Sequence, residues 1–184
     1  MTGFRLSAKG GAGIFDVRPD IVSYGKVLGG GFPIGAVGGR SEIMKTKNVF
    51  YGGTFSANPL SMYAAKLILE TIIEKKYINY DNLDAAGKKF RDDLNKFFIN
   101  EGKKMRAIGC GAINRIVFTD KPIMNRKDRD LYEPANAQST FSKILKNLKV
   151  FVNGNGLYHL SMSHTPEVIG NLVGKIKKAS TNEP

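Results

Sequence analysis

The feature that most constrains this chain is a lysine placed between an apolar run and a run of glycines. Residues 21–25 are mostly β-branched or aromatic, Lys26 follows them, and Gly29, Gly30 and Gly31 come three residues later. The apolar run is typical of a buried strand, whereas consecutive glycines favour a tight turn or a close backbone approach. The sequence therefore places an amine where a rigid strand gives way to a permissive loop.

An amine at such a junction is a candidate nucleophile. Desolvation or a nearby cation lowers the pKa of a lysine, and the neutral amine can then form a Schiff base with a carbonyl. The chain also carries 28 Lys and Arg residues, most of which must be solvated surface charges. The local pattern alone leaves both interpretations of Lys26 open.

Length and composition suit one ordinary domain, or one and a half, with a real core. No apolar run is long enough to span a membrane, and no secretion signal opens the chain. The single Cys110 excludes an internal disulfide framework and indicates a reducing, cytoplasmic compartment. The abrupt opening of the chain would also suit a fragment of something larger.

The net charge of +12 comes from lysines spread along the chain. Pairs of lysines fall on or beside predicted helices, where solvation is the usual explanation; they are Lys75-Lys76, Lys88-Lys89, Lys103-Lys104 and Lys177-Lys178. Nucleic-acid binding favours a basic stripe with interleaved aromatic residues, and no such stripe is present. We expect no nucleic-acid partner, although the charge could attract anionic ligands.

A change in composition near residues 77–82 predicts two domains, 1–80 and 81–184. In the first we expect a glycine-rich loop at 2–18, a strand at 35–40, a short helix at 41–44 and a longer helix from Asn58 or Pro59. In the second we expect a helix capped by Asp81 or Asn82 and closed by Gly102. An α+β pattern follows, with strands at 107–110, 113–118, 150–152 and 157–162, a polar loop at 119–136, a turn at 153–156, and helices around 141–148 and from 165.

A second candidate site lies at Gly52-Gly53-Thr54, a few residues before the longer helix. Backbone N–H groups, a hydroxyl and a helix N-terminus together make a fair phosphate site, although an ordinary capped loop would look the same. With a reactive lysine earlier in the chain, this pattern suggests a phosphorylated carbonyl cofactor, and pyridoxal 5'-phosphate fits both halves.

At this point the sequence resembles a known family. Residues 1–5, 19–20, 25–36 and 53–59 are similar to the core motifs of class III pyridoxal-phosphate-dependent aminotransferases. Within that class, residues 118–122 and 160–165 are most similar to glutamate-1-semialdehyde 2,1-aminomutase and its relatives.

The resemblance implies an α/β fold of the fold-type I class, with the C-terminal portion of the large domain followed by an α+β C-terminal small domain. It implies that Lys26 forms the Schiff base and then moves protons, and that Thr54, with Gly53, contacts the cofactor phosphate across a homodimer interface. It also implies a small-molecule amino donor and acceptor, with amino-group transfer as the reaction.

Two departures from the family pattern qualify these implications. The family's aspartate for the pyridine nitrogen lies just before the segment that matches Met1–Arg5, so we expect this chain alone to be an incomplete site. The aminomutase glutamate has no counterpart in residues 153–159, which leaves aminomutase and intermolecular aminotransferase both open. The alternative is an inactive remnant that serves only as a binding or structural module.

Three further patterns give only weak support for a functional site. Ser23 and Lys26 fit Ser-x-x-Lys, but the partner motifs of penicillin-recognising enzymes are missing. His159 and His164 are predicted to point to opposite faces and so not to form a metal pair. Cys110 lies in an apolar stretch and is expected to be core rather than a nucleophile.

Overall fold

The computed structural model describes residues 3–46, 52–74, 78–152 and 154–181. It divides into two units, Met1–Tyr80 and Asp81–Pro184, which are described separately below. The expectations for Met1-Thr2, Lys75-Lys76 and Asn153 lie outside the described residues.

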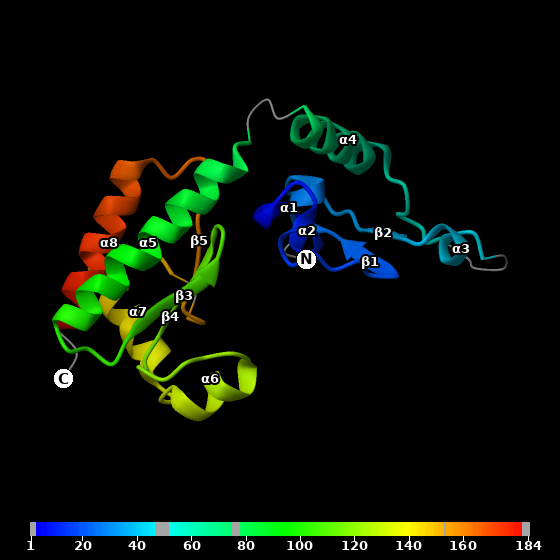
Figure 1. The fold of residues 1–184 in the computed structure, drawn as a ribbon. Coiled ribbons are helices and arrows are strands. Elements are labelled where there is room, and N and C mark those ends of the chain that lie inside the picture. Colours follow the sequence, from blue (N-terminus) through cyan, green and yellow to red (C-terminus); the bar gives the residue numbers. More distant parts are fainter. Residues whose placement is uncertain (1–2, 47–51, 75–77, 153, 182–184) are drawn as a thin grey trace. The chain divides into compact units, whose positions relative to one another are not determined.

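The first unit contains a two-stranded sheet and one long helix (Figure 1). Strands β1 (Ile21–Tyr24) and β2 (Ala36–Gly39) are antiparallel, with Ile21 opposite Gly39 and Tyr24 opposite Ala36. The predicted strands and helices are confirmed in position here, but β1 is not the buried strand that its apolar run indicated, since none of its four residues is buried and Ile21 is 55% exposed. The glycine-rich opening segment forms two short helices. The other elements are α1 (Gly3–Leu6), α2 (Gly10–Ile14), the 3-10 turn η1 (Lys26–Gly29), α3 (Ser41–Met44) and α4 (Pro59–Ile73).

Phe4 of α1 is held by two contacts, one to Tyr24 of β1 and one to Tyr80. The rings of Phe4 and Tyr24 are stacked with their centroids 5.3 Å apart, and the Tyr80 hydroxyl donates a hydrogen bond of 2.6 Å to the Phe4 carbonyl. Burial raises the pKa of Tyr80. These contacts order the start of the chain next to the strand that leads to Lys26.

Helix α4 packs against η1. Gly30 follows η1 in the left-handed region with φ of 57°, and a Cβ at this position would come within 3.3 Å of the Ile68 side chain on α4. Both the backbone angle and the short spacing favour glycine. The run of glycines therefore lets the lysine turn lie close to the helix.

The second unit is an α+β domain with one three-stranded antiparallel sheet in the order β3-β4-β5. Strands β3 (Arg106–Cys110), β4 (Ile113–Val117) and β5 (Leu157–His159) pair through Ile108 opposite Arg115 and Ile113 opposite His159. The helices are α5 (Tyr80–Asn100), α6 (Arg126–Tyr132), α7 (Ala137–Asn147) and α8 (Pro166–Thr181). Figure 1 shows α5 and α8 side by side, and the Lys177 amine of α8 lies 5.3 Å from the centre of the Phe97 ring of α5.

A single core holds this unit together. Its fully buried side chains come from all three long helices and from β4, and they include Phe90, Phe98, Leu94, Ile116, Phe141, Leu145 and Ile176. Two polar pairs lie inside the unit: Arg91 donates to Asn114, which is fully buried, at 2.5 Å, and Arg115 and Glu133 form an ion pair at 3.1 Å. The buried Nε of Arg115 has no hydrogen-bond partner among the described residues.

The end of α5 is closed by Gly102, as predicted. Gly102 has φ of 62°, and hydrogen bonds run from its N–H to Ile99 and from the Lys103 N–H to Phe98, at 3.1 and 2.8 Å. This pair of bonds is a Schellman motif, in which glycine adopts the left-handed conformation without steric cost.

Three expectations for the second unit were wrong. The helix begins at Tyr80, so neither Asp81 nor Asn82 precedes it as a cap. The supposed loop 119–136 contains α6, whose capping box joins Asn125 and Asp128. Residues 150–152 form no strand, because Lys149 is left-handed and the Val150 N–H closes α7 on the Leu145 carbonyl at 2.9 Å.

The predicted strand 157–162 is shorter than expected. It ends at His159, and it pairs with β4 rather than with the residues before the turn. The second unit therefore has three strands, not four, among its described residues.

Candidate functional site

Lys26 lies at the junction that the sequence indicated, in an unusual backbone conformation. Strand β1 ends at Tyr24, Gly25 is extended, and Lys26 has φ of 53°. The left-handed region costs a non-glycine residue roughly 1–2 kcal/mol. Such strain persists only where the surroundings enforce it, and it is often found at functional sites.

The Lys26 side chain is exposed rather than buried. The expectation of an amine desolvated by its own strand is therefore not met within this chain. Among the described residues Lys26 has no ion-pair partner and no hydrogen bond from its amine, so the amine is open to a ligand. The neighbouring Leu28 and Gly29 are buried and anchor the turn that carries it.

Thr54 lies in a short loop that ends at the start of α4. The loop is closed by a hydrogen bond of 2.9 Å from the Ser56 N–H to the Gly53 carbonyl, and a Cβ on Gly53 would come within 3.3 Å of Ser56 Oγ. Asn58 caps α4, since its Oδ1 accepts from the N–H groups of Leu60 and Ser61 at 3.1 and 3.2 Å. The predicted start of this helix is confirmed.

The Thr54 loop lines a hollow of about 500 Å³ together with residues from another part of the chain. Pro33, Ile34 and Gly35 also line it, and they follow the glycine run after Phe32. Lys26 is not among the lining residues. The structure thus brings Thr54 and Gly53 to the far end of the lysine motif, but not to Lys26 itself.

The sequence did not predict that Pro33–Gly35 lies close to the Thr54 loop. The two segments lie about twenty residues apart, and no hydrophobic period or motif spacing links them. Helix α4, which begins at the Thr54 loop, packs against η1, which precedes Pro33, and this packing brings the two segments close.

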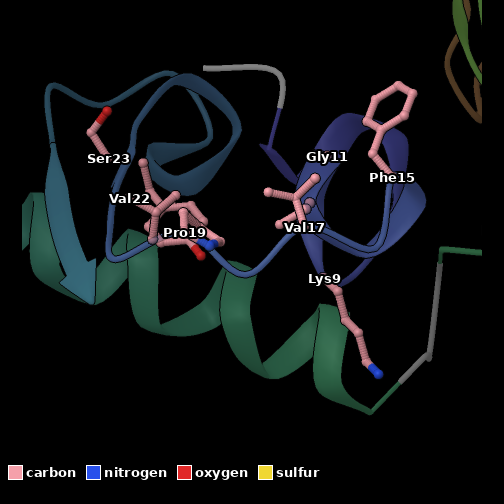
Figure 2. A pocket seen from close by; sticks show the side chains of 10 residues that line it. Lys9, Gly11, Phe15, Val17, Pro19, Val22 and Ser23 are labelled. Carbon is pink, nitrogen blue, oxygen red and sulfur yellow. The ribbon is translucent and has the colours of Figure 1, made fainter. Parts of the chain in front are cut away.

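A second hollow of about 290 Å³ lies between α2 and β1 (Figure 2). Its lining is largely apolar and includes Phe15, Val17, Pro19 and Val22. In Figure 2 the Lys9 amine points away from Pro19 and Val22. This hollow therefore offers an apolar surface rather than an anion site.

The remaining reactive side chains lie outside both hollows. Cys110 is half-buried at the end of β3. The Ser161 N–H donates to His164 Nδ1 at 3.0 Å, and the Ser161 hydroxyl lies 2.8 Å from the same atom. His159 ends β5. No group of three metal-ligating side chains occurs among the described residues, and no helix in that part of the chain is long and apolar enough to cross a membrane.

Two features of these residues fit a phosphorylated aldehyde. An accessible amine at Lys26 suits a carbonyl carbon, and a hydroxyl beside glycine amides at Gly53-Thr54 suits a phosphate. The acidic side chain nearest in sequence to the lysine strand, Asp20, is occupied by an ion pair of 3.2 Å with Arg40.

Curated relatives of similar sequence are glutamate-1-semialdehyde 2,1-aminomutases. The protein from Hydrogenobaculum sp. is 34% identical over 184 residues, which cover 97% of this chain and 43% of the relative. The protein from Clostridium botulinum is 31% identical, covering 100% of this chain and 44% of the relative. The chain thus spans less than half the length of the curated relatives that it matches.

Solved structures show the same fold. An ω-transaminase from Sphaerobacter thermophilus superposes with a TM-score of 0.83 at 24% identity, covering 98% of this chain and 42% of that one. A β-phenylalanine aminotransferase from Variovorax paradoxus gives 0.82 at 27% identity, with coverage of 97% and 42%. The expected α/β fold of the fold-type I class is confirmed by these neighbours.

The family model for class III aminotransferases matches residues 1–164, which include both the Lys26 turn and the Thr54 loop. With this match over most of its length, the chain belongs to the class III aminotransferase family.

Proposed function

We propose that this chain is part of an enzyme of amino-group transfer that uses pyridoxal 5'-phosphate, with Lys26 as the cofactor amine. The observation that carries the proposal is the position of Lys26: an exposed amine on a left-handed residue between β1 and η1, inside the family motif. Solved neighbours support the cofactor, since one is described as a transaminase with PLP bound and another as a PLP form of the FumI protein of Sphingopyxis sp..

Each candidate residue has a chemical role in this proposal. The Lys26 amine would hold the cofactor aldehyde, and Nζ would hold or return a proton beside the substrate. The Thr54 hydroxyl and the Gly53 backbone N–H hold the phosphate. The bound cofactor supplies an electron-withdrawing ring that makes the substrate Cα–H acidic.

The proposed assembly follows the family resemblance. Residues 1–80 supply part of the cofactor-binding domain and 81–184 the small domain, in line with the division at Tyr80–Asp81. Because the hollow of Thr54 does not include Lys26, we propose that Thr54 serves the Lys26 site of a second copy in a homodimer. The single cysteine supports a cytoplasmic setting.

The substrates are a small-molecule amino donor and acceptor, and two reactions remain as candidates. The curated relatives favour an aminomutase, in which the amino group moves within one molecule. The absence of a glutamate from residues 153–159 favours transfer between two molecules. A half-reaction with candidate amino donors separates these from an inert binding module, which would bind the cofactor but convert no donor.

The test is reductive trapping with pyridoxal phosphate and borohydride, followed by peptide mass spectrometry. We expect Lys26 to be labelled well above Lys45, an exposed lysine of the same unit, and Lys26→Ala to remove that excess while Lys45→Ala leaves it. The chain alone should label weakly, and adding the part of the Hydrogenobaculum relative that it does not match should strengthen labelling. Equal labelling of Lys26 and Lys45 in that mixture would reject the proposal.

A further inference from the structure

We propose that Asn58 is a positioning residue for the phosphate. It accepts hydrogen bonds from the N-terminal amides of α4, so these amides cannot bind the anion, and it holds the Gly53–Thr54 loop in place as the anion contact. This inference rests on the proposed function, since it takes the same loop as the phosphate site. It goes further by assigning a role to a residue outside the expected set and by excluding the helix N-terminus as the anion site.

The first turn of α4 has no amide to offer an anion. Pro59, at the first position, has no N–H, and the next two N–H groups donate to Asn58 Oδ1 at 3.1 and 3.2 Å. The fourth, from Met62, donates to the Asn58 carbonyl at 2.9 Å. A helix N-terminus binds anions through unsatisfied N–H groups, and here one asparagine residue and one proline remove them.

The loop before the helix, unlike the first turn of α4, has a free hydrogen-bonding group. Thr54 lines the hollow of about 500 Å³, and within the described residues its hydroxyl has no hydrogen-bond partner. The turn is held by the bond from Ser56 to Gly53, and Ala57, between turn and cap, is left-handed with φ of 53°. The loop is therefore tied to α4 through a strained residue, and the Asn58 cap fixes where the helix begins.

Loss of the cap should move the loop without removing any proposed contact. An asparagine cap contributes about 1 kcal/mol to a helix. Without it the first turn can fray, and Ala57 can leave the left-handed region. The Thr54 hydroxyl would then no longer be held beside the Gly53 amide.

The chain contains a matched control in Asn125. This residue caps α6 in the same way, with Oδ1 accepting from Lys127 and Asp128 at 2.8 and 3.1 Å. Asn125→Ala removes the same bonds from a helix of the other unit. Asn58→Ser retains a capping oxygen and is the conservative variant that should restore the effect.

The experiment titrates the full chain with inorganic phosphate and follows the amide NMR signals of Gly53 and Thr54. We expect these signals to shift in the wild type, and the phosphate affinity to fall about fivefold in Asn58→Ala. Asn58→Ser should restore most of the affinity, and Asn125→Ala should leave it unchanged. Sulfate serves as a second anion and should compete at the same signals.

Several outcomes would overturn the proposal. These are shifts at Leu60 and Ser61 instead of Gly53 and Thr54, an unchanged affinity in Asn58→Ala, no recovery in Asn58→Ser, or no phosphate response in the wild type. The signals of β1 and β2 report whether the first unit is folded in the Asn58 variants, and the signals of the second unit report the same for Asn125→Ala. Because Lys26 plays no part in this titration, its result is independent of the trapping experiment that tests the proposed function.

Discussion

The two units of this chain differ in what holds them together. The second unit has a contiguous core with several fully buried aromatic and aliphatic side chains, such as Phe90, Phe98 and Leu145. The first unit has few buried apolar side chains among its described residues; they are Leu6, Leu28, Ala65 and Ile72. It also leaves large apolar groups exposed, including Phe15, Phe55, Leu60 and Ile73.

The buried core and the candidate site residues thus lie in different units. Burial of apolar area is the dominant favourable term in folding, so the second unit has the means to fold by itself. The candidate residues Lys26, Gly53 and Thr54 all lie in the first unit, whose two-stranded sheet would be marginal alone. The proposed site is thus built on the part of the chain that depends more on contacts beyond its own residues.

The largest expected effect comes from comparing one phenylalanine in each unit. Phe90 is fully buried, whereas Phe55 is 86% exposed. We expect Phe90→Ala to lower the free energy of unfolding of the second unit by about 3–5 kcal/mol, and Phe55→Ala to change stability by less than about 0.5 kcal/mol. Denaturant unfolding with hydrogen exchange read out by unit checks both. Equal losses would show that the first unit has a core of its own around Phe55.

High pH should weaken the second unit through Tyr158. Its side chain is only 5% exposed, and burial raises the pKa of its hydroxyl. Above about pH 10 the unfolded chain loses this proton while the folded chain keeps it, so the folded state binds more protons. Stability should then fall by about 1.4 kcal/mol per pH unit as the pH rises.

Tyr158→Phe should abolish this extra loss between pH 10 and 11, measured as the free energy of unfolding at several pH values. Tyr63→Phe, at a position 60% exposed in the first unit, is the control and should leave the slope unchanged. If both variants showed the wild-type slope, burial of Tyr158 would not be the cause.

The smallest expected effect concerns the strained Ala57. Because its φ is 53°, replacing it by glycine relieves a steric cost but adds unfolded-state entropy. We expect Ala57→Gly to stabilise the first unit by up to about 1 kcal/mol. Ala64→Gly, inside α4, should instead destabilise it by about 1 kcal/mol. A loss in both variants would mean that Ala57 bears no strain.

Local chemistry in the sequence predicted much of the fold. The Asn58-Pro59 start of α4, the Gly102 end of α5 and the hairpin of β3 and β4 were all visible, because caps, glycines and alternating residues act over a few positions. Helix α6 was missed although Asn125 and Asp128 have the spacing of a capping box. That signal was present and could have been used.

Other features could not be found from the sequence. Val150–Val152 is apolar enough for a strand, but closure of α7 by Lys149 and Val150 removes it from the sheet, and Phe151 is 95% exposed. The site shows the same limit: the motifs identified Lys26 and Thr54, but not the left-handed backbone at Lys26 or the wall formed by Pro33–Gly35. Both depend on tertiary packing that no local pattern encodes.

The close packing of Gly30 against Ile68 restricts how this region can vary. A larger residue at position 30 would meet the Ile68 side chain and would also have to adopt a left-handed φ. Since α4 begins at the Thr54 loop and packs on the Lys26 turn, displacement of the helix would alter the spacing of the two motifs. A smaller residue at position 68 would relieve the contact but not the backbone cost, so we expect position 30 to stay glycine wherever this turn is kept.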